Sequence, residues 1–98
     1  MGTVKLPPQL KGIIWTKKFE DLDLQQDEIV IIHHVLRYGK VEDIAWLLQA
    51  YPHEKIKQIF LSQPLNIYSK SSFHFAKSTV LNISQDLPDE SRYIQSFS

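Results

Sequence analysis

The stretch Ile29-Val-Ile-Ile-His-His-Val-Leu-Arg-Tyr-Gly39 decides the fold, because it joins an apolar helical pattern to a glycine. Its aliphatic residues recur at steps of three and four positions, which places them on one side of an α-helix. This core-facing stripe comprises Ile29, Ile32, Val35 and Leu36. The helix is expected to begin near Asp23 or Asp27, and Asp23, with Gln26 three residues later, resembles a capping box. Gly39 is expected to end the helix in a left-handed conformation. The pattern predicts a helix over residues 24–38.

Two adjacent histidines, His33 and His34, interrupt the apolar run and raise the question of a metal or catalytic site. Neighbouring residues of a helix point about 100° apart, so this pair cannot bind one metal ion from the same face. We expect His33 at the edge of the core beside Arg37, and His34 exposed on the side of Tyr38. At the core boundary, the protonation of His33 is expected to be coupled to packing around pH 6 to 7.

Three more helices are predicted downstream of this stretch. Apolar residues at helical spacing lead to Tyr51, after which Pro52 prevents the backbone bonding from continuing. Pro52 is also a favourable first residue for the next helix, which Pro64 stops. A fourth apolar face includes Phe73 and follows serines that can cap a helix start. The predicted helices cover residues 24–38, 41–51, 53–63 and 70–83.

The N-terminal residues carry a weaker helical signal. Leu6-Pro7-Pro8 prevents a helix across the two prolines, so residues 1–22 are predicted to form an extended arm. This arm is expected to dock Trp15 and its neighbours onto the core. A short strand at residues 12–15 is the alternative, although one strand has no obvious partner.

The C-terminal residues 84–98 are mostly polar and are expected to form a flexible tail. Tyr93, Ile94 and Phe97 are the residues of this tail that are expected to contact the core. With 98 residues, of which 43% are hydrophobic, the chain is long enough for one core. We therefore predict a single all-α domain over residues 1–98, built as a small bundle of about four short helices.

Composition excludes several classes of function. The chain has no cysteine, which excludes disulfides, thiolate zinc sites and cysteine nucleophiles. The 11 basic and 11 acidic residues cancel, so no overall electric field attracts nucleic acid. Neither a bilayer-spanning apolar run nor a signal peptide is recognisable, so we expect a cytoplasmic protein without a membrane role.

Catalytic and cofactor motifs are also missing from the sequence. It contains no Gly-Xaa-Ser-Xaa-Gly turn, phosphate-binding loop or His-Glu-Xaa-Xaa-His arrangement. His53 and His74 lie in other predicted helices, and nothing in their spacing makes them converge with His33 or His34. We therefore expect no enzyme activity, no cofactor and no metal site.

A set of residues in the centre of the chain forms a recognisable pattern. It comprises Val35-Leu36-Arg37-Tyr38-Gly39, Glu42-Asp43-Ile44-Ala45-Trp46-Leu47-Leu48, Tyr51, Glu54-Lys55-Ile56, Leu65, Ser69 and Phe73. Over roughly residues 7–77, this pattern resembles a family of small prokaryotic proteins catalogued as a domain of unknown function. Members of that family are often encoded beside nucleotidyltransferase-like toxins of the abortive-infection type, so the resemblance implies an antitoxin or accessory role. The chain departs from the family at Ile14-Trp15-Thr16, where relatives usually carry an aromatic-Trp-Asp element.

Two hypotheses about function follow. The first is a protein-interaction module, in which aromatic residues outside the core contact a partner protein. The candidate partner-binding residues are Tyr38, Trp46, Phe73 and Phe75. Trp46 flanks the apolar stripe of its helix, so burial in the monomer is an equally good interpretation of that residue.

The alternative is a helix-turn-helix-like, nucleic-acid-binding regulator that uses residues 44–60. Its second helix would present His53, Lys55, Lys57 and Gln58 to the nucleic acid. The glycine that is usual in the tight turn is missing, and two helices in ordinary packing give the same apolar spacing. The net charge of zero makes this hypothesis the weaker of the two.

Overall fold

The computed structural model describes residues 6–15, 18–84 and 90–95, so the predicted contact of Phe97 falls outside the described residues. The described residues form four α-helices and no β-strand, which confirms the predicted all-α fold. The helices are α1 (Glu28–Tyr38), α2 (Val41–Ala50), α3 (His53–Ser62) and α4 (Lys70–His74). Short helical turns complete the fold: the 3₁₀ turns η1 (Pro8–Gly12), η2 (Phe19–Asp21) and η4 (Glu90–Arg92), and the π-helical turn η3 (Phe75–Val80), which continues α4.

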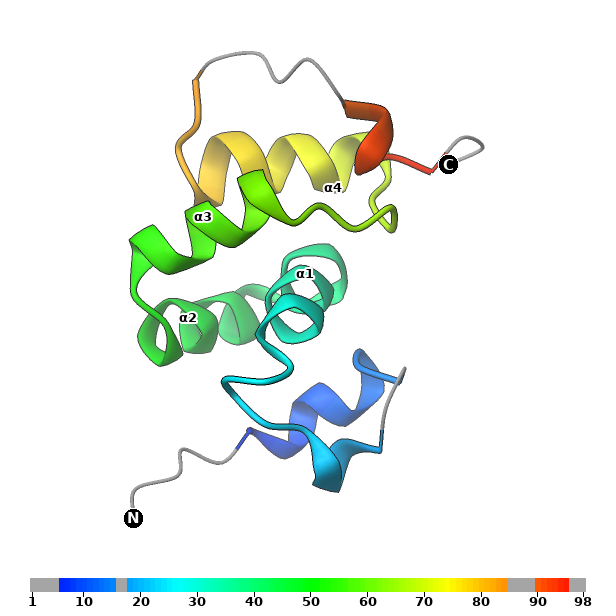
Figure 1. Cartoon of the computed structure of the whole chain (residues 1–98), viewed down its shortest axis with the longest axis vertical. Coiled ribbons are helices and arrows are strands. Elements are labelled where there is room, and N and C mark those ends of the chain that lie inside the picture. Colours follow the sequence, from blue (N-terminus) through cyan, green and yellow to red (C-terminus); the bar gives the residue numbers. More distant parts are fainter. Residues whose placement is uncertain (1–5, 16–17, 85–89, 96–98) are drawn as a thin grey trace.

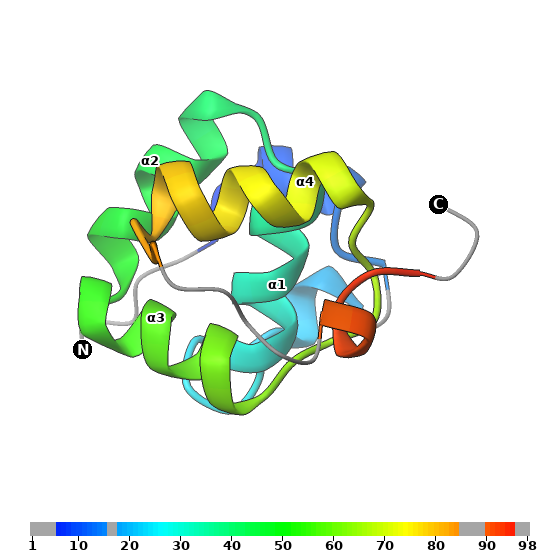
Figure 2. The same ribbon diagram turned by 90° about the horizontal axis from the view of Figure 1, so that it is seen from above.

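Helix α1 lies at the centre of the molecule, and α2, α3 and α4 each pack against it (Figure 1 and Figure 2). Every residue from Ile31 to Leu36 is buried, the two histidines included. A helix is buried all round in this way when other elements cover it on several sides. The prediction of a one-sided stripe is therefore wrong, and Ile29, which was expected in the core, is only half-buried.

The helix boundaries differ from the predicted ones by a few residues. Helix α1 begins at Glu28 instead of residue 24, because the Asp23 carboxylate accepts two backbone N–H groups, at 3.0 and 2.7 Å, and so caps a separate turn. Helices α2 and α3 each end one residue earlier than predicted. The fourth helix ends with η3 at Val80 instead of residue 83, shortly before Asn82, whose φ of 57° is incompatible with a right-handed helix.

Within the predicted arm, the described residues 6–15 and 18–22 fold into turns, and residues 12–15 form no strand, so the prediction of an extended arm is wrong for them. Pro8 occupies the first position of η1, where a backbone N–H would have no helical partner anyway. Leu10 and Ile14 are buried in the core. The prediction that Trp15 and its neighbours dock onto the core is confirmed for Ile14, which is buried, and wrong for Trp15, which is 59% exposed.

Residues 90–95 fold back onto the core, so the prediction of a flexible tail is wrong for this segment. The predicted contact of Tyr93 is confirmed: the residue is 4% exposed, and its hydroxyl donates a hydrogen bond to the carbonyl of Phe60. The backbone N–H of Tyr68 donates to the Tyr93 carbonyl over 2.9 Å, and Tyr68 also forms an isolated parallel bridge with Ile94. These hydrogen bonds hold the segment in place despite its polar composition.

His33 is fully buried, with its ring centroid 6.0 Å from that of Phe60 and 5.7 Å from that of Tyr68. The Gln63 carbonyl can only accept a hydrogen bond, so Nε2 of His33 carries the hydrogen and donates it over 2.8 Å. Nδ1 is then an acceptor, and it receives the hydrogen of the Tyr68 hydroxyl over 2.7 Å. One neutral imidazole therefore ties α1 to both ends of the link between α3 and α4.

Burial lowers the pKa of His33 from 6.5 to about 4, because the charged form would lose its hydration. The hydrogen bond to the Gln63 carbonyl opposes this shift, and repulsion from the neighbouring His34 adds a smaller decrease. His34 is 4% exposed, and burial also lowers its pKa. The predictions that His33 lies at the core boundary and titrates near pH 6 to 7, and that His34 is exposed, are wrong. Their common cause is that the core surrounds α1 instead of touching it on one side.

Gly39 ends α1 for a different reason from the predicted one. Its φ is −75°, an ordinary value for any residue, so the expected left-handed cap is absent here. A Cβ atom at this position would lie 2.5 Å from the carbonyl oxygen of Val35 and 3.0 Å from the Cβ of Asp43. The glycine is required because its own backbone lies against the last turn of α1, at the Val35 carbonyl, with Asp43 of α2 packed beside it.

We predict that the free energy of unfolding falls as the pH is lowered from 6.5 towards 4. In this range the unfolded chain binds a proton at His33 that the folded chain does not bind, so protonation favours unfolding. The loss from His33 is roughly 2 kcal/mol at pH 5. Denaturant titrations of His33→Gln should show lower stability but a flatter dependence on pH than those of the unmodified chain. An unchanged slope in His33→Gln would contradict the role assigned to this histidine.

Gly39→Ala is expected to lower the free energy of unfolding by about 1 to 3 kcal/mol, because the added methyl group overlaps the Val35 carbonyl. Gly12→Ala is the matched control, since no atom lies within 4 Å of a Cβ at that position. The control should be neutral or stabilising by up to about 1 kcal/mol through the unfolded state. Urea unfolding of both variants checks this pair, and equal stabilities would show that the close approach at Gly39 is no constraint.

Candidate functional site

An aromatic pair, the exposed Trp15 and the half-buried Tyr38, lies where the segment after η1 meets the end of α1. Trp15 is 59% exposed, and its ring centroid lies 4.9 Å from that of Tyr38. The ring of the buried His34 supports the indole in an edge-on arrangement, with 5.3 Å between the centroids. The buried Ile14 holds the backbone in place immediately before Trp15. We call Trp15, Tyr38 and the adjoining Arg37 the Trp15–Tyr38 surface.

Arg37 brings a positive charge to this surface. Its guanidinium carbon lies 4.6 Å from the centre of the Tyr38 ring, within the range of a cation–π interaction. Its Nε–H donates a hydrogen bond of 2.8 Å to the carbonyl of Ile67, in the link that leads to α4. Because this bond uses only Nε, the two terminal nitrogens of the guanidinium still carry four N–H donors. The surface thus combines two aromatic rings with a positioned cation.

A cavity of about 400 Å³ adjoins the Trp15–Tyr38 surface, because Tyr38 forms part of its wall. It lies between η1 and the junction of α1 with α2. Its lining residues are Gln9, Gly12, Ile13, Tyr38, Lys40, Glu42 and Asp43. This volume is in the range of pockets that hold a small ligand or a side chain of another protein. The Trp15–Tyr38 surface therefore continues into a concave surface at Tyr38.

Asp43 is a deeply buried charged residue in this cavity, with 6% of its surface exposed. One carboxylate oxygen accepts the backbone N–H of Lys40 over 2.8 Å and so caps the start of α2. The other accepts Nε2–H of Gln9 over 2.7 Å, which joins η1 to α2. Since a carboxylate has about four acceptor positions, Asp43 can accept further hydrogen bonds from a ligand.

The predicted partner-binding residues do not lie together. Tyr38 belongs to the Trp15–Tyr38 surface, and Trp46 is half-buried against the core. Phe73 is fully buried, so its prediction as a contact residue is wrong; its ring stacks 5.9 Å from that of Phe60, because α4 turns this side towards α3. Phe75 is 43% exposed on η3, which lies at the opposite end of the molecule from η1 (Figure 1).

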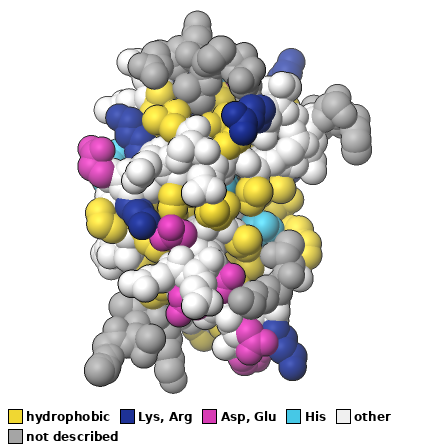
Figure 3. All heavy atoms as spheres, viewed as in Figure 1, with side chains coloured by type: hydrophobic (Ala, Val, Ile, Leu, Met, Phe, Trp, Pro, Cys, Tyr) yellow, Lys and Arg dark blue, Asp and Glu magenta, His cyan; other side chains and the backbone are white. Residues whose placement is uncertain are grey.

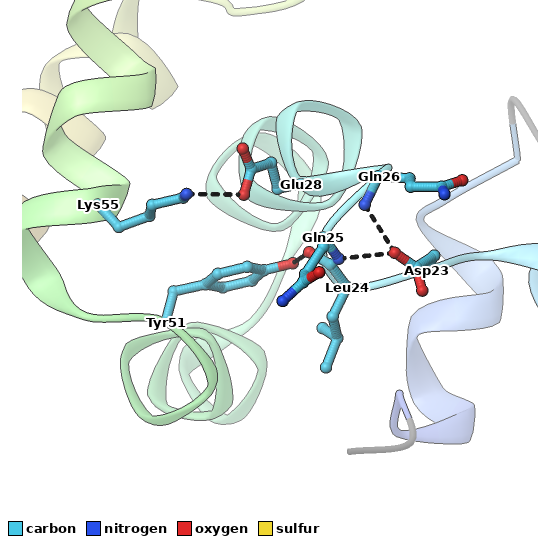
Figure 4. Close-up of polar contacts among 7 residues, drawn as sticks. All are labelled: Asp23, Leu24, Gln25, Gln26, Glu28, Tyr51 and Lys55. Atoms are coloured by element: carbon cyan, nitrogen blue, oxygen red, sulfur yellow. Dashed lines mark hydrogen bonds and ion pairs between the residues drawn. The ribbon is translucent and has the colours of Figure 1, made fainter. Parts of the chain in front are cut away.

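The predicted nucleic-acid-binding residues all lie on α3. His53 and Gln58 are exposed, and Lys55 and Lys57 are half-buried. The Lys55 ammonium lies 3.2 Å from the carboxylate of Glu28, so its charge is paired at the start of α1 (Figure 4). Beside this ion pair, the Tyr51 hydroxyl donates to the Leu24 carbonyl over 2.7 Å. The ion pair attaches α3 to the start of α1 and gives Lys55 a structural role, and the Tyr51 hydrogen bond attaches the α2–α3 junction to the turn before α1.

The ring nitrogens of the two adjacent histidines make hydrogen bonds inside the protein. Both nitrogens of His33 are bonded in the core, and Nδ1–H of His34 donates to the Val30 carbonyl over 3.0 Å. Within residues 6–15, 18–84 and 90–95, no three or more His, Cys, Asp or Glu side chains are placed to hold a metal ion. His33 and His34 are therefore explained by packing.

Reasoning from the sequence missed both the exposure of Trp15 and the cavity. Figure 3 shows one face of the molecule, on which hydrophobic side chains gather in the middle among polar ones. The run Gly12-Ile13-Ile14-Trp15 signals an apolar segment, but only the turn η1 decides that Ile14 points inwards and Trp15 outwards. No sequence signal predicts the cavity, because its walls come from η1, α1 and α2.

Comparisons with known proteins relate this region to a family. Residues 10–60, just over half of the chain, match the model of a family described as "Family of unknown function (DUF6922)". This range contains Trp15, α1, α2 and most of the cavity wall. No match was found among curated proteins or among solved structures. In the part of the chain that the structure describes, no helix is long and apolar enough to cross a membrane. The chain belongs to the DUF6922 family.

Proposed function

We propose that the protein is a protein-interaction module whose Trp15–Tyr38 surface contacts a partner protein. The observation that carries this proposal is the 59% exposure of Trp15 beside the rings of Tyr38 and His34. An indole that stays in water contributes little to the stability of the monomer. Tryptophan, tyrosine and arginine are the residue types that contribute most to binding energy in protein interfaces.

The geometry of this surface is held in place by the core. Tyr38 is part of α1, and the hydrogen bond to the Ile67 carbonyl holds Arg37 along the same helix. Side chains that are already ordered lose little conformational entropy when a partner binds, which favours affinity. The Trp15–Tyr38 surface therefore has the chemistry and the rigidity of a contact site.

The resemblance to proteins encoded beside nucleotidyltransferase-like toxins supports an antitoxin or accessory role for the module. An antitoxin that acts by binding its toxin needs a contact surface and no catalytic centre. We therefore propose a binding protein without enzyme activity, and its lack of cysteine fits a reducing compartment such as the cytoplasm.

Nucleic-acid binding through α3 is the less well supported alternative. Lys55, its central cation, is paired with Glu28 over 3.2 Å, and the exposed Glu54 carries a negative charge at the start of the same helix. Non-specific attraction to nucleic acid requires several cations that are free to contact phosphates. The charge distribution of α3 thus favours a structural role over phosphate binding.

When the tagged full-length chain is used to capture its partner from the native host, Trp15→Ser is expected to reduce the amount of partner captured. Truncation of a central interface residue costs at least about 2 kcal/mol, so the amount of retained partner should fall by roughly thirtyfold. Quantitative mass spectrometry after gentle affinity capture measures this loss. Leu61→Ser is the control, because Leu61 is another exposed apolar residue, on α3, with 38% of its surface exposed. Its substitution should leave capture unchanged.

Retention of the same proteins by Trp15→Ser and by the unmodified chain would contradict the proposed surface, provided that circular dichroism shows the same fold. Repeated recovery of the chain alone would contradict the interaction module itself. Binding to duplex DNA that weakens steeply with salt and is lost in Lys57→Glu would favour the alternative.

A further inference from the structure

We infer that the cavity beside Tyr38 binds an arginine side chain that the partner protein presents. This inference deepens the proposed function and rests on it, since the arginine belongs to the same partner that contacts Trp15. Tyr38 lies both in the cavity wall and 4.9 Å from Trp15, so one segment of a partner can reach both places. The occupant follows from the charge, the hydrogen-bonding capacity and the size of the cavity.

The charge of the cavity wall favours a cation. Two carboxylates, those of Glu42 and Asp43, line it together with one ammonium group, that of Lys40. Asp43 is 6% exposed and tied by two hydrogen bonds, so its charge cannot move away from a ligand. Lys40 and Glu42 are both exposed, and their flexible side chains can turn into solvent, so Asp43 carries the fixed charge of the wall. The fixed charge that a ligand meets is therefore negative, and an anion such as phosphate is disfavoured.

The fixed orientation of the Asp43 carboxylate favours a guanidinium over an ammonium group as its ligand. One of its oxygens holds the Lys40 backbone N–H and the other holds the Gln9 amide, which fixes the plane of the carboxylate. Each oxygen keeps capacity for another hydrogen bond. A guanidinium offers two parallel N–H donors to a carboxylate, whereas an ammonium group acts as a point charge. The prepositioned carboxylate thus suits the planar fork of arginine.

The size and the apolar part of the cavity agree with this occupant. A volume of about 400 Å³ admits the guanidinium together with its methylene stem. Arginine stems commonly pack on apolar side chains while the charged group makes polar contacts. Ile13 and Tyr38 supply such an apolar surface in the cavity wall, in addition to the two carboxylates.

The direct test is an NMR titration of the isotopically labelled full-length chain with three small probes. N-acetyl-arginine methylamide should shift the amide signals of Gly12, Ile13, Lys40 and Asp43 in a saturable manner. N-acetyl-lysine methylamide should bind at least about threefold more weakly, because it lacks the planar fork. N-acetyl-citrulline methylamide, which has a similar shape without the charge, should leave these signals in place.

Two variants with the same change in net charge locate the effect. Glu42→Gln, in the cavity wall, should weaken binding of the arginine probe by about twofold to fivefold. Glu54→Gln, on the exposed side of α3, should bind it like the unmodified chain. Asp43→Asn should abolish binding, but Asp43 also caps α2, so the Glu42 and Glu54 pair separates a ligand contact from a folding defect.

The inference is overturned if the citrulline probe shifts the same signals with equal affinity, or if the arginine probe shifts none of them. It is also overturned if Glu42→Gln and Glu54→Gln have equal effects. Each of these three failures leaves the proposed function standing as long as capture of the partner still depends on Trp15. Loss of that dependence with arginine binding intact would instead overturn the proposed surface and keep the cavity site.

Discussion

The burial of α1 on all sides is the constraint on which the rest of the structure depends. Each of its buried aliphatic side chains stabilises the fold by about 1.5 to 3 kcal/mol relative to exposure, so the neighbouring elements must cover the whole circumference. His33 in the same helix also needs polar partners, because an unbonded buried imidazole would cost stability. The link between α3 and α4 supplies them at Gln63 and Tyr68, which fixes its path across α1.

The C-terminal segment is held by the same arrangement. Tyr68, whose hydroxyl donates to His33, also donates its backbone N–H to the carbonyl of Tyr93. The Tyr93 ring stacks on the Phe60 ring with 4.8 Å between the centroids, and the Tyr93 hydroxyl donates a hydrogen bond to the Phe60 carbonyl. The central helix, the α3–α4 link and residues 90–95 are therefore connected through a continuous set of aromatic and hydrogen-bond contacts.

The sequence predicted the all-α fold and the order of the helices because their ends depend on local signals, such as Pro52 and Pro64. It did not predict which sides of α1 are buried, since that depends on elements distant in the chain. The same limit explains the candidate site: Tyr38 was predicted, whereas the exposure of Trp15 and the environment of Asp43 require η1 to fold against α1 and α2. The core that buries Ile14 leaves Trp15 beside Tyr38, so the proposed contact surface is a consequence of how α1 is covered.

Native-state hydrogen exchange, followed residue by residue, tests the central position of α1 most directly. If α1 is enclosed on all sides, the amides from Ile31 to Leu36 should exchange last, and only through global unfolding. Their exchange free energy should then equal the free energy of unfolding measured with denaturant. Exchange of these amides through a smaller opening, while α3 or α4 stays protected, would contradict the claim that the structure is built around α1.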